Sequence, residues 1–179
     1  ELLNGDNPLW VNPTDEDLLL LAHLDNAWSL GGSRVALGAS WAGGANVEER
    51  FTHALGADLS VDLRRPLQQE PWLTWQAEYA LATQSLRVER RTRGGVSSWV
   101  QCRLSRRWWG QLRYDLYGLP QESAEGGEDR ATVLFTFERS PRFPLRFQYS
   151  RWRVEADDRG YNQYHVQLNF AIGPHGARG

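Results

Sequence analysis

The chain has 179 residues, a length sufficient for one domain with a substantial core. Its formal net charge of -2 provides no overall positive field, which argues against nucleic-acid binding. Cys102 is the only cysteine, so an intrachain disulfide is excluded, and no apolar run is long enough for a transmembrane helix. The high Trp and Gly counts favour β-structure.

The first half of the chain alternates apolar and polar residues, which is the period of a β-strand with two different faces. Leu55, Leu59 and Val61, for example, alternate with Asp58 and Ser60. This pattern predicts strands over 18–28, 34–41, 53–63 and 72–82, with a tight turn at 31–33.

The second half repeats the alternation. Near its end Tyr164, Val166 and Leu168 are separated by His165 and Gln167. The pattern predicts further strands over 96–105, 108–118, 130–138, 143–153 and 162–172.

The predicted strands number about nine and have roughly ten residues each, as transmembrane β-strands do. No segment has the periodicity of a helix, and no domain boundary is evident. The sequence therefore predicts one all-β domain over 1–179, an antiparallel up-and-down transmembrane β-barrel. Its strands are expected over about 17–173, with residues 1–16 as an external loop.

Short turns and longer, charged loops are expected to alternate along the chain, as at the two rims of an outer-membrane barrel. The C-terminus then lies on the short-turn, periplasmic side. The basic segment 87–95 and the acidic segment 121–129 are expected among the long loops. Either both are simply solvated, or the basic one contacts lipopolysaccharide phosphates or anionic solutes.

About nine strands is an odd number, whereas bacterial single-chain barrels have an even number. One interpretation is that the chain is the C-terminal part of a larger barrel, with a signal and strands N-terminal to it. The other is a complete barrel of about eight strands, with residues 1–12 lying across one rim.

Aromatic residues gather near the strand ends on the apolar side of the alternation, as in the interfacial girdle of a bilayer protein. The predicted lipid-facing girdle comprises Trp41, Trp75, Tyr79, Tyr114, Tyr149, Tyr164 and Phe170. A soluble, lipocalin-like barrel with an aromatic core is the rival interpretation.

Polar residues on the other side of the alternation are candidates for lining a lumen. They are Asp58, Glu78, Arg103, Arg113, Asp115, Arg146, Gln148, His165, Gln167 and Asn169. These side chains form a selectivity lining or, as we favour for most of them, pair across strands and satisfy one another.

Three segments resemble parts of Gram-negative porin-like outer-membrane proteins: 4–7 (NGDN), 106–115 (RRWWGQLRYD) and the final stretch 167–177 (QLNFAIGPHGA). The resemblance implies a β-barrel in the bacterial outer membrane with solute passage as its default role. Many such barrels end on an aromatic residue read by the barrel-assembly machinery. This chain ends on Arg178 and Gly179 and departs from that pattern.

The expected function is therefore a porin-like channel or transport barrel for small solutes. The partners are outer-membrane lipid, lipopolysaccharide and the barrel-assembly machinery. A non-transporting structural or adhesion barrel is the alternative within the membrane class. None of the four histidines lies in a metal-ligand motif and no nucleophile motif occurs, so neither a cofactor nor an enzymatic activity is expected.

Overall fold

The fold is described from a computed structural model that places residues 2–3, 19–46, 48–65, 70–120, 127–138, 144–154 and 159–169. Every helix or strand in these ranges is a β-strand. The same ranges contain no helix that is both long and apolar enough to cross a membrane. The predicted all-β class is confirmed.

The strands follow the predicted order closely. In chain order they are β1 (Leu2–Leu3), β2 (Leu19–Leu30), β3 (Ser33–Ala45), β4 (Phe51–Leu63), β5 (Leu73–Ser85), β6 (Arg90–Arg103), β7 (Trp108–Leu119), β8 (Glu128–Glu138), β9 (Pro144–Val154) and β10 (Arg159–Leu168). Nine of them are long, and β1 is a two-residue strand within the segment expected to be an external loop.

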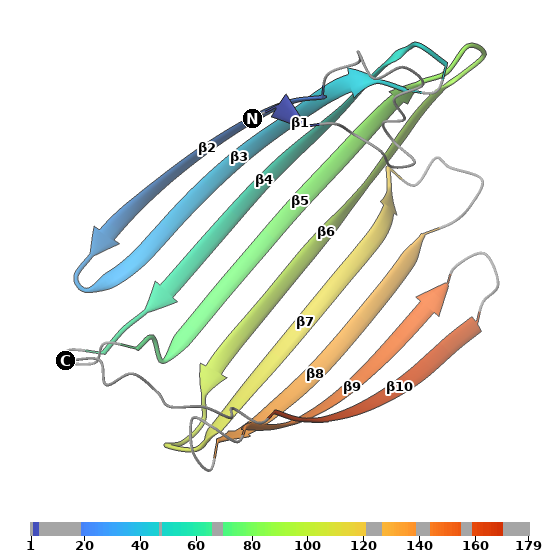
Figure 1. The fold of residues 1–179 in the computed structure, drawn as a ribbon. Coiled ribbons are helices and arrows are strands. Elements are labelled where there is room, and N and C mark those ends of the chain that lie inside the picture. Colours follow the sequence, from blue (N-terminus) through green and yellow to red (C-terminus); the bar gives the residue numbers. More distant parts are fainter. Residues whose placement is uncertain are drawn as a thin grey trace.

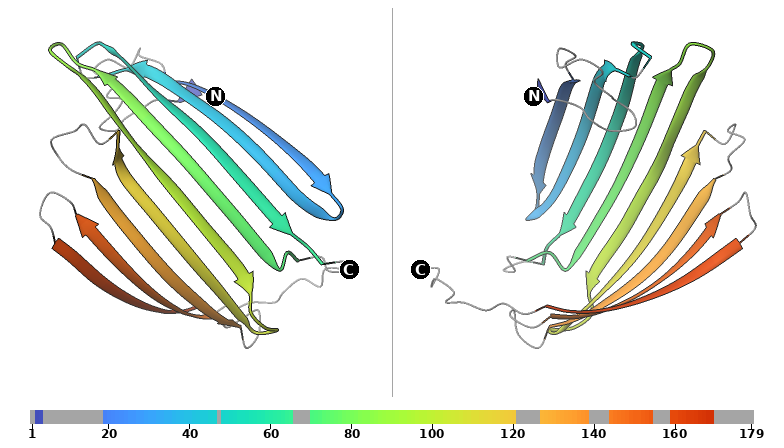
Figure 2. Two further views of the ribbon diagram at one scale, coloured as in Figure 1. Left: turned by 180° about the vertical axis from the view of Figure 1, so that it is seen from behind. Right: turned by 45° about the vertical axis from the view of Figure 1, so that its right-hand side comes forward.

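All ten strands form one sheet in sequence order, and each pairs antiparallel with the next (Figure 1). The up-and-down antiparallel prediction is confirmed. The sheet curves across its width into an open trough (Figure 2). It is not closed: in the described ranges β10 pairs with β9 alone, and β1 covers only Leu19 and Leu20 along the other edge.

The register aligns rows of mostly apolar residues and rows of mostly polar residues across the sheet. Leu37 lies opposite Leu59, and Leu59 lies opposite Ala77. The neighbouring row pairs Ala36 with Ser60 and then Gln76. Because side chains alternate between faces along each strand, the period-two pattern of the sequence becomes one apolar and one polar surface.

Strand β6 begins earlier than expected. Segment 90–95, predicted to be loop, belongs to the strand, and only residues 86–89 form the connection. The error came from Gly94 and Gly95, which suggested a loop but here allow close strand approach. A Cβ on Gly94 would lie 2.6 Å from the Ala80 carbonyl oxygen. A β-bulge occurs at this pair, opposite Gly118, whose φ is +89°.

The predicted alternation of short turns and long loops is wrong. One rim, called the first rim, carries connections 31–32, 64–72, 104–107 and 139–143. The second rim carries connections 46–50, 86–89, 120–127 and 155–158. Each rim has one long and three short connections, because several Gly-rich and charged segments extend strands.

Asn46 organises the second rim from a fully buried position. Its side-chain oxygen accepts hydrogen bonds from the backbone N–H groups of Glu48 (3.0 Å) and Arg50 (3.2 Å). Its amide donates to Thr52 Oγ1 (3.1 Å) and to the Ser85 carbonyl oxygen (2.7 Å). One side chain therefore joins the β3–β4 connection to the end of β5.

The sheet is a single layer with almost no hydrophobic core. Leu19 and Ala36 are the only buried hydrophobic residues in the described ranges. Large apolar side chains, by contrast, are exposed on nearly every strand. The stability of this architecture therefore depends on whatever covers its apolar face.

Candidate functional site: the polar inner face

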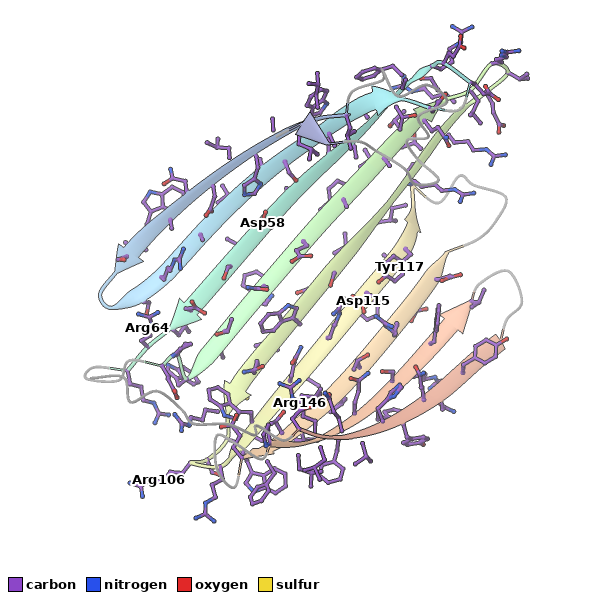
Figure 3. The ribbon with its side chains drawn as sticks, viewed as in Figure 1. Asp58, Arg64, Arg106, Asp115, Tyr117 and Arg146 are labelled. Atoms are coloured by element: carbon purple, nitrogen blue, oxygen red, sulfur yellow. The ribbon has the colours of Figure 1, made fainter. Side chains whose placement is uncertain are left out.

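Side-chain exposure alternates with the same period as polarity. Ala36 and Gly38 are buried while Leu37 and Ala39 are exposed, and Asp115 is buried while Tyr114 is exposed. Side chains on the concave side of a curved sheet crowd one another, so the buried set marks the inner face. Figure 3 labels Asp58, Asp115, Tyr117 and Arg146 on the polar side of the trough.

The predicted lumen-lining residues share this inner face. Asp58, Glu78, Arg103, Arg113, Asp115, Arg146, Gln148, His165 and Gln167 occupy the same register rows and alternate with the apolar set. Asn169 follows β10, and its Oδ1 accepts a hydrogen bond from Gln167 (2.9 Å). The nine residues within strands are spread over six strands, so only some of them lie close together.

The polar cluster with the most contacts between its own side chains surrounds Asp115, whose side chain is 0% exposed. Arg113 Nε lies 2.8 Å from Asp115 Oδ1, and Arg130 Nη2 lies 3.1 Å from Asp115 Oδ2. Ser97 hydrogen-bonds the same carboxylate. Three neighbouring strands thus satisfy one buried charge, as expected for cross-strand pairing.

Arg130 and Ser97 were missed because the sequence does not show which strands pair. Once β7 and β8 form a hairpin, however, the register places Asp115 directly opposite Arg130. Thr132 and Ser150 were missed for the same reason. Their hydroxyl oxygens lie 2.9 Å apart and both residues are buried, while Gln148 donates to Ser150 (3.1 Å).

The N-terminal half of the inner face is acidic and much less paired. Asp58 lies directly opposite Glu78, so two carboxylates face each other on adjacent strands. The Asp58 carboxylate lies over Gly38, where a Cβ would be 2.2 Å from Oδ1. Asp58 has no hydrogen-bond or ion-pair partner among the described residues. Like charges in this position repel, so this pair costs stability.

A depression of about 690 Å³ opens on the sheet from β4 to β8. Small residues form much of it, among them Ala80, Ala82 and Gly95, and its charged lining includes Glu78, Arg93, Arg113 and Glu128. Both signs of charge are therefore presented to a space large enough for water and a small polar solute.

The predicted aromatic girdle lies on the outer, apolar face, with Tyr164 the most exposed member at 76%. Tyr149 contacts Tyr164, with ring centroids 5.1 Å apart, and donates to Asn162 (2.9 Å). The predicted set is Trp41, Trp75, Tyr79, Tyr114, Tyr149 and Tyr164, with Phe170 outside the described residues.

Two outer-face tryptophans were missed, Trp28 and Trp108. Trp28 occupies the same register row as Trp75, and Trp108 contacts Phe137 with centroids 4.9 Å apart. Their apolar parity was the signal that could have identified them. Aromatic residues are not confined to the outer face, however, because Trp99, Tyr117 and Trp152 share the inner parity.

No group of three or more His, Cys, Asp or Glu side chains is placed to hold a metal ion in the described ranges. His23 and His165 share the inner face but lie on β2 and β10, at opposite sides of the sheet. The absence of an enzymatic activity stays a prediction.

Comparison with known proteins gives no relative: no family model, no curated protein and no solved structure matches the chain.

Proposed function

We propose that the chain forms part of a transmembrane β-barrel of a bacterial outer membrane, with a porin-like pathway for small solutes along its inner face. One observation carries the proposal. The sheet is a single layer, and its outer face exposes large apolar side chains that no described element covers. An apolar surface of this extent marks a contact with lipid or protein.

The distribution of polarity favours lipid outside the trough. Charged residues such as Asp58, Glu78 and Arg113 line the inner face, whereas Leu112 and Val166 on the outer face are 57% and 70% exposed. A soluble, lipocalin-like barrel would need the opposite arrangement, with an apolar interior and a polar exterior. The arrangement therefore supports the membrane class over the soluble alternative.

The open edges restrict how a barrel could close. Eight antiparallel pairings separate the long strands β2 and β10, so these two strands run in the same direction. Direct closure would pair them parallel, whereas a wholly antiparallel barrel needs an odd number of further strands between them. Strand β1 already runs antiparallel along the free edge of β2, with Leu2 opposite Leu20.

The non-transporting barrel remains the second candidate because of the Asp115 cluster. There, one carboxylate bridges two arginines from neighbouring positions, as in a lumen closed by ion pairs. Asp58 and Glu78, which form no ion pair within 4.0 Å among the described residues, and the adjacent depression favour an open path instead.

Two measurements on the full-length protein test the proposal. Folded protein in detergent should migrate faster than boiled protein on a gel, and it should give conductance steps in a planar bilayer. Failure to partition into detergent or membranes would contradict the barrel. Heat-modifiable migration without conductance or solute uptake would instead favour the structural barrel.

Ion selectivity provides a sharper test of the lumen. Asp58→Asn with Glu78→Gln removes two inner-face carboxylates, so the reversal potential in a salt gradient should shift toward anions. Asp129→Asn removes an acid of the outer parity and should leave the reversal potential unchanged. Equal effects of the two changes would contradict the assignment of the faces.

A further inference from the structure

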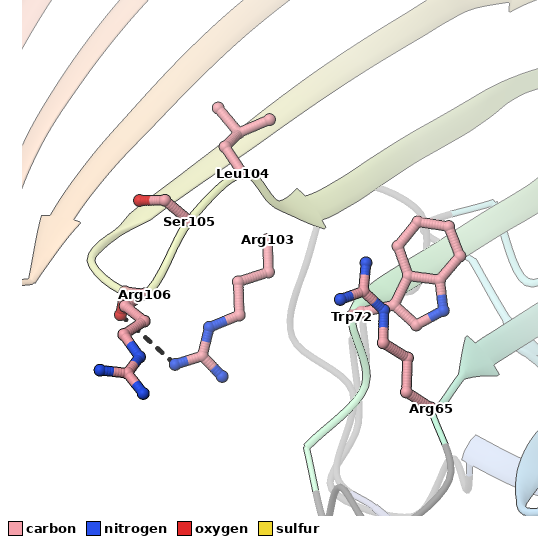
Figure 4. Close-up of a pocket in the computed structure, with 6 residues that line it drawn as sticks. All are labelled: Arg65, Trp72, Arg103, Leu104, Ser105 and Arg106. Atoms are coloured by element: carbon pink, nitrogen blue, oxygen red, sulfur yellow. Dashed lines mark hydrogen bonds between the residues drawn. The ribbon is translucent and has the colours of Figure 1, made fainter.

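A pocket of about 330 Å³ lies at the first rim, between the β4–β5 and β6–β7 connections (Figure 4). Its lining residues are Arg65, Trp72, Arg103, Leu104, Ser105 and Arg106. The pocket shares Arg103 with the inner face, but none of its other lining residues belongs to the predicted lumen-lining set or to the cluster around Asp115.

Main-chain hydrogen bonds fix the walls of the pocket. The Trp72 N–H donates to the Leu63 carbonyl oxygen (2.9 Å), and the Arg103 N–H donates to the Trp72 carbonyl oxygen (2.8 Å). The β6–β7 turn is closed by a bond from the Leu104 N–H to the Trp108 carbonyl oxygen (2.9 Å). These bonds fix the backbone at the strand ends that carry the side chains lining the pocket.

The positive charge of this region is far from balanced. Segments 64–72 and 103–107 contain five arginines and a single acid, Glu70. Glu70 pairs with Arg103 at 2.9 Å. Arg65 lies over the Trp72 ring, 5.5 Å from its centroid, and the Arg106 side chain has no carboxylate partner among the described residues.

The other acids near this rim hydrogen-bond to neutral groups, and neither forms an ion pair with these arginines among the described residues. Asp62 accepts a hydrogen bond from Thr74 (2.8 Å), and Glu138 accepts one from the Trp109 indole (3.3 Å). The Arg103 guanidinium, besides pairing with Glu70, donates to the Arg106 carbonyl oxygen (3.4 Å) and so lies beside the turn (Figure 4). The excess charge is therefore left for a ligand.

We propose that this pocket binds a phosphate group. Guanidinium groups present forked donors that match phosphate oxygens, and a bound anion relieves the repulsion among neighbouring arginines. The phosphate can come from an anionic phospholipid headgroup or from free phosphate. The site itself goes beyond the proposed function, and only its assignment to lipid rests on a membrane location of the rim.

Titration calorimetry of the full chain in a neutral maltoside detergent tests the site with three probes. Dihexanoyl phosphatidylglycerol tests the lipid headgroup, inorganic phosphate tests the free anion, and dihexanoyl phosphatidylcholine tests binding through the acyl chains alone. Saturable binding of phosphatidylglycerol alone supports a lipid site, and binding of inorganic phosphate supports a free-phosphate site.

Four variants make the test specific, and each is first checked for the β-sheet signal in circular dichroism. Arg65→Gln and Arg106→Gln should each weaken binding about tenfold, because each removes a charged donor. Glu70→Gln should strengthen binding, because it frees Arg103 from its carboxylate. The matched control, Arg50→Gln on the second rim, should leave binding unchanged.

The proposal is overturned if neither phosphatidylglycerol nor phosphate binds the folded chain. It is also overturned if phosphatidylcholine binds as tightly as phosphatidylglycerol, or if Arg50→Gln weakens binding as much as Arg106→Gln. The calorimetry needs no conductance or membrane insertion. A failed phosphate site therefore leaves the barrel proposal standing, and a failed barrel leaves the free-phosphate result standing.

Discussion

The two faces of this sheet are built from the same strands but differ in what stabilises them. On the inner face, Asp115, Thr132 and Ser150 are buried and hydrogen-bonded across strands. On the outer face, residues such as Tyr114 and Val166 are exposed, and no second layer of described residues covers them. The inner face around Asp115 is therefore satisfied by its own hydrogen bonds and ion pairs, while the outer face needs an apolar environment to be stable.

A charge placed on the outer face tests this difference with the largest effect. Leu112→Arg should lower the free energy of unfolding from lipid vesicles by about 2–4 kcal/mol, because the guanidinium must enter hydrocarbon. Gln111→Arg moves the same charge by one residue to the inner face and should cost little. Denaturant titration followed by tryptophan fluorescence measures both, and equal losses would contradict the assignment of the faces.

Neutralising the central inner carboxylate should have the next largest effect. Asp115→Asn leaves Arg113 and Arg130 without their counter-charge, and the loss should be about 2 kcal/mol, since both arginines remain about one-third exposed and partly solvated. The same denaturant titration measures it. The matched change Asp25→Asn, an exposed acid on edge strand β2, should have almost no effect on the unfolding midpoint.

A reciprocal exchange between adjacent positions sharpens the comparison. Thr132→Val removes an inner hydroxyl that hydrogen-bonds Ser150, so we expect a loss of about 1 kcal/mol. Val133→Thr places a hydroxyl on the outer face and should also destabilise the protein, but only in lipid. A Val133→Thr loss of equal size in lipid and in a non-inserted, soluble state would be evidence against lipid contact at this position.

The smallest effect is expected at Trp75. Its indole N–H donates to Ser98 Oγ (3.0 Å) at an exposed position on the outer face. Trp75→Phe keeps the apolar ring and removes this bond, so the unfolding free energy should fall by about 0.5–1 kcal/mol. Ser98→Ala removes the acceptor and should give a similar loss, with no added loss in the double variant.

The strands and their faces were predictable because a period of two is a local property of the sequence. Segment 53–63, for example, lies within β4. The partners of Asp115 were not predictable in this way, because they depend on the register between separate strands. Gly94 and Gly95 misled the prediction of β6, since glycine accompanies both loops and close strand approach.

Features of the rims were the hardest to anticipate. Asn46 is polar and lies in a charged segment, yet it is fully buried because its side chain satisfies backbone groups of two connections. Strand β1 depends on pairing between Leu2 and Leu20, which no local pattern encodes. The pocket at the first rim likewise needs two connections that are distant in sequence.

Spin labelling tests the central claim most directly, because it reports the environment of each face. In a Cys102→Ser background, a single cysteine is introduced at Gln111, Leu112, Arg113 or Tyr114, labelled, and the protein is reconstituted in lipid vesicles. Labels at 112 and 114 should collide with dissolved oxygen and be shielded from a water-soluble nickel chelate, while labels at 111 and 113 should show the reverse. Water accessibility at all four positions, or the opposite alternation, would contradict a lipid-facing outer surface.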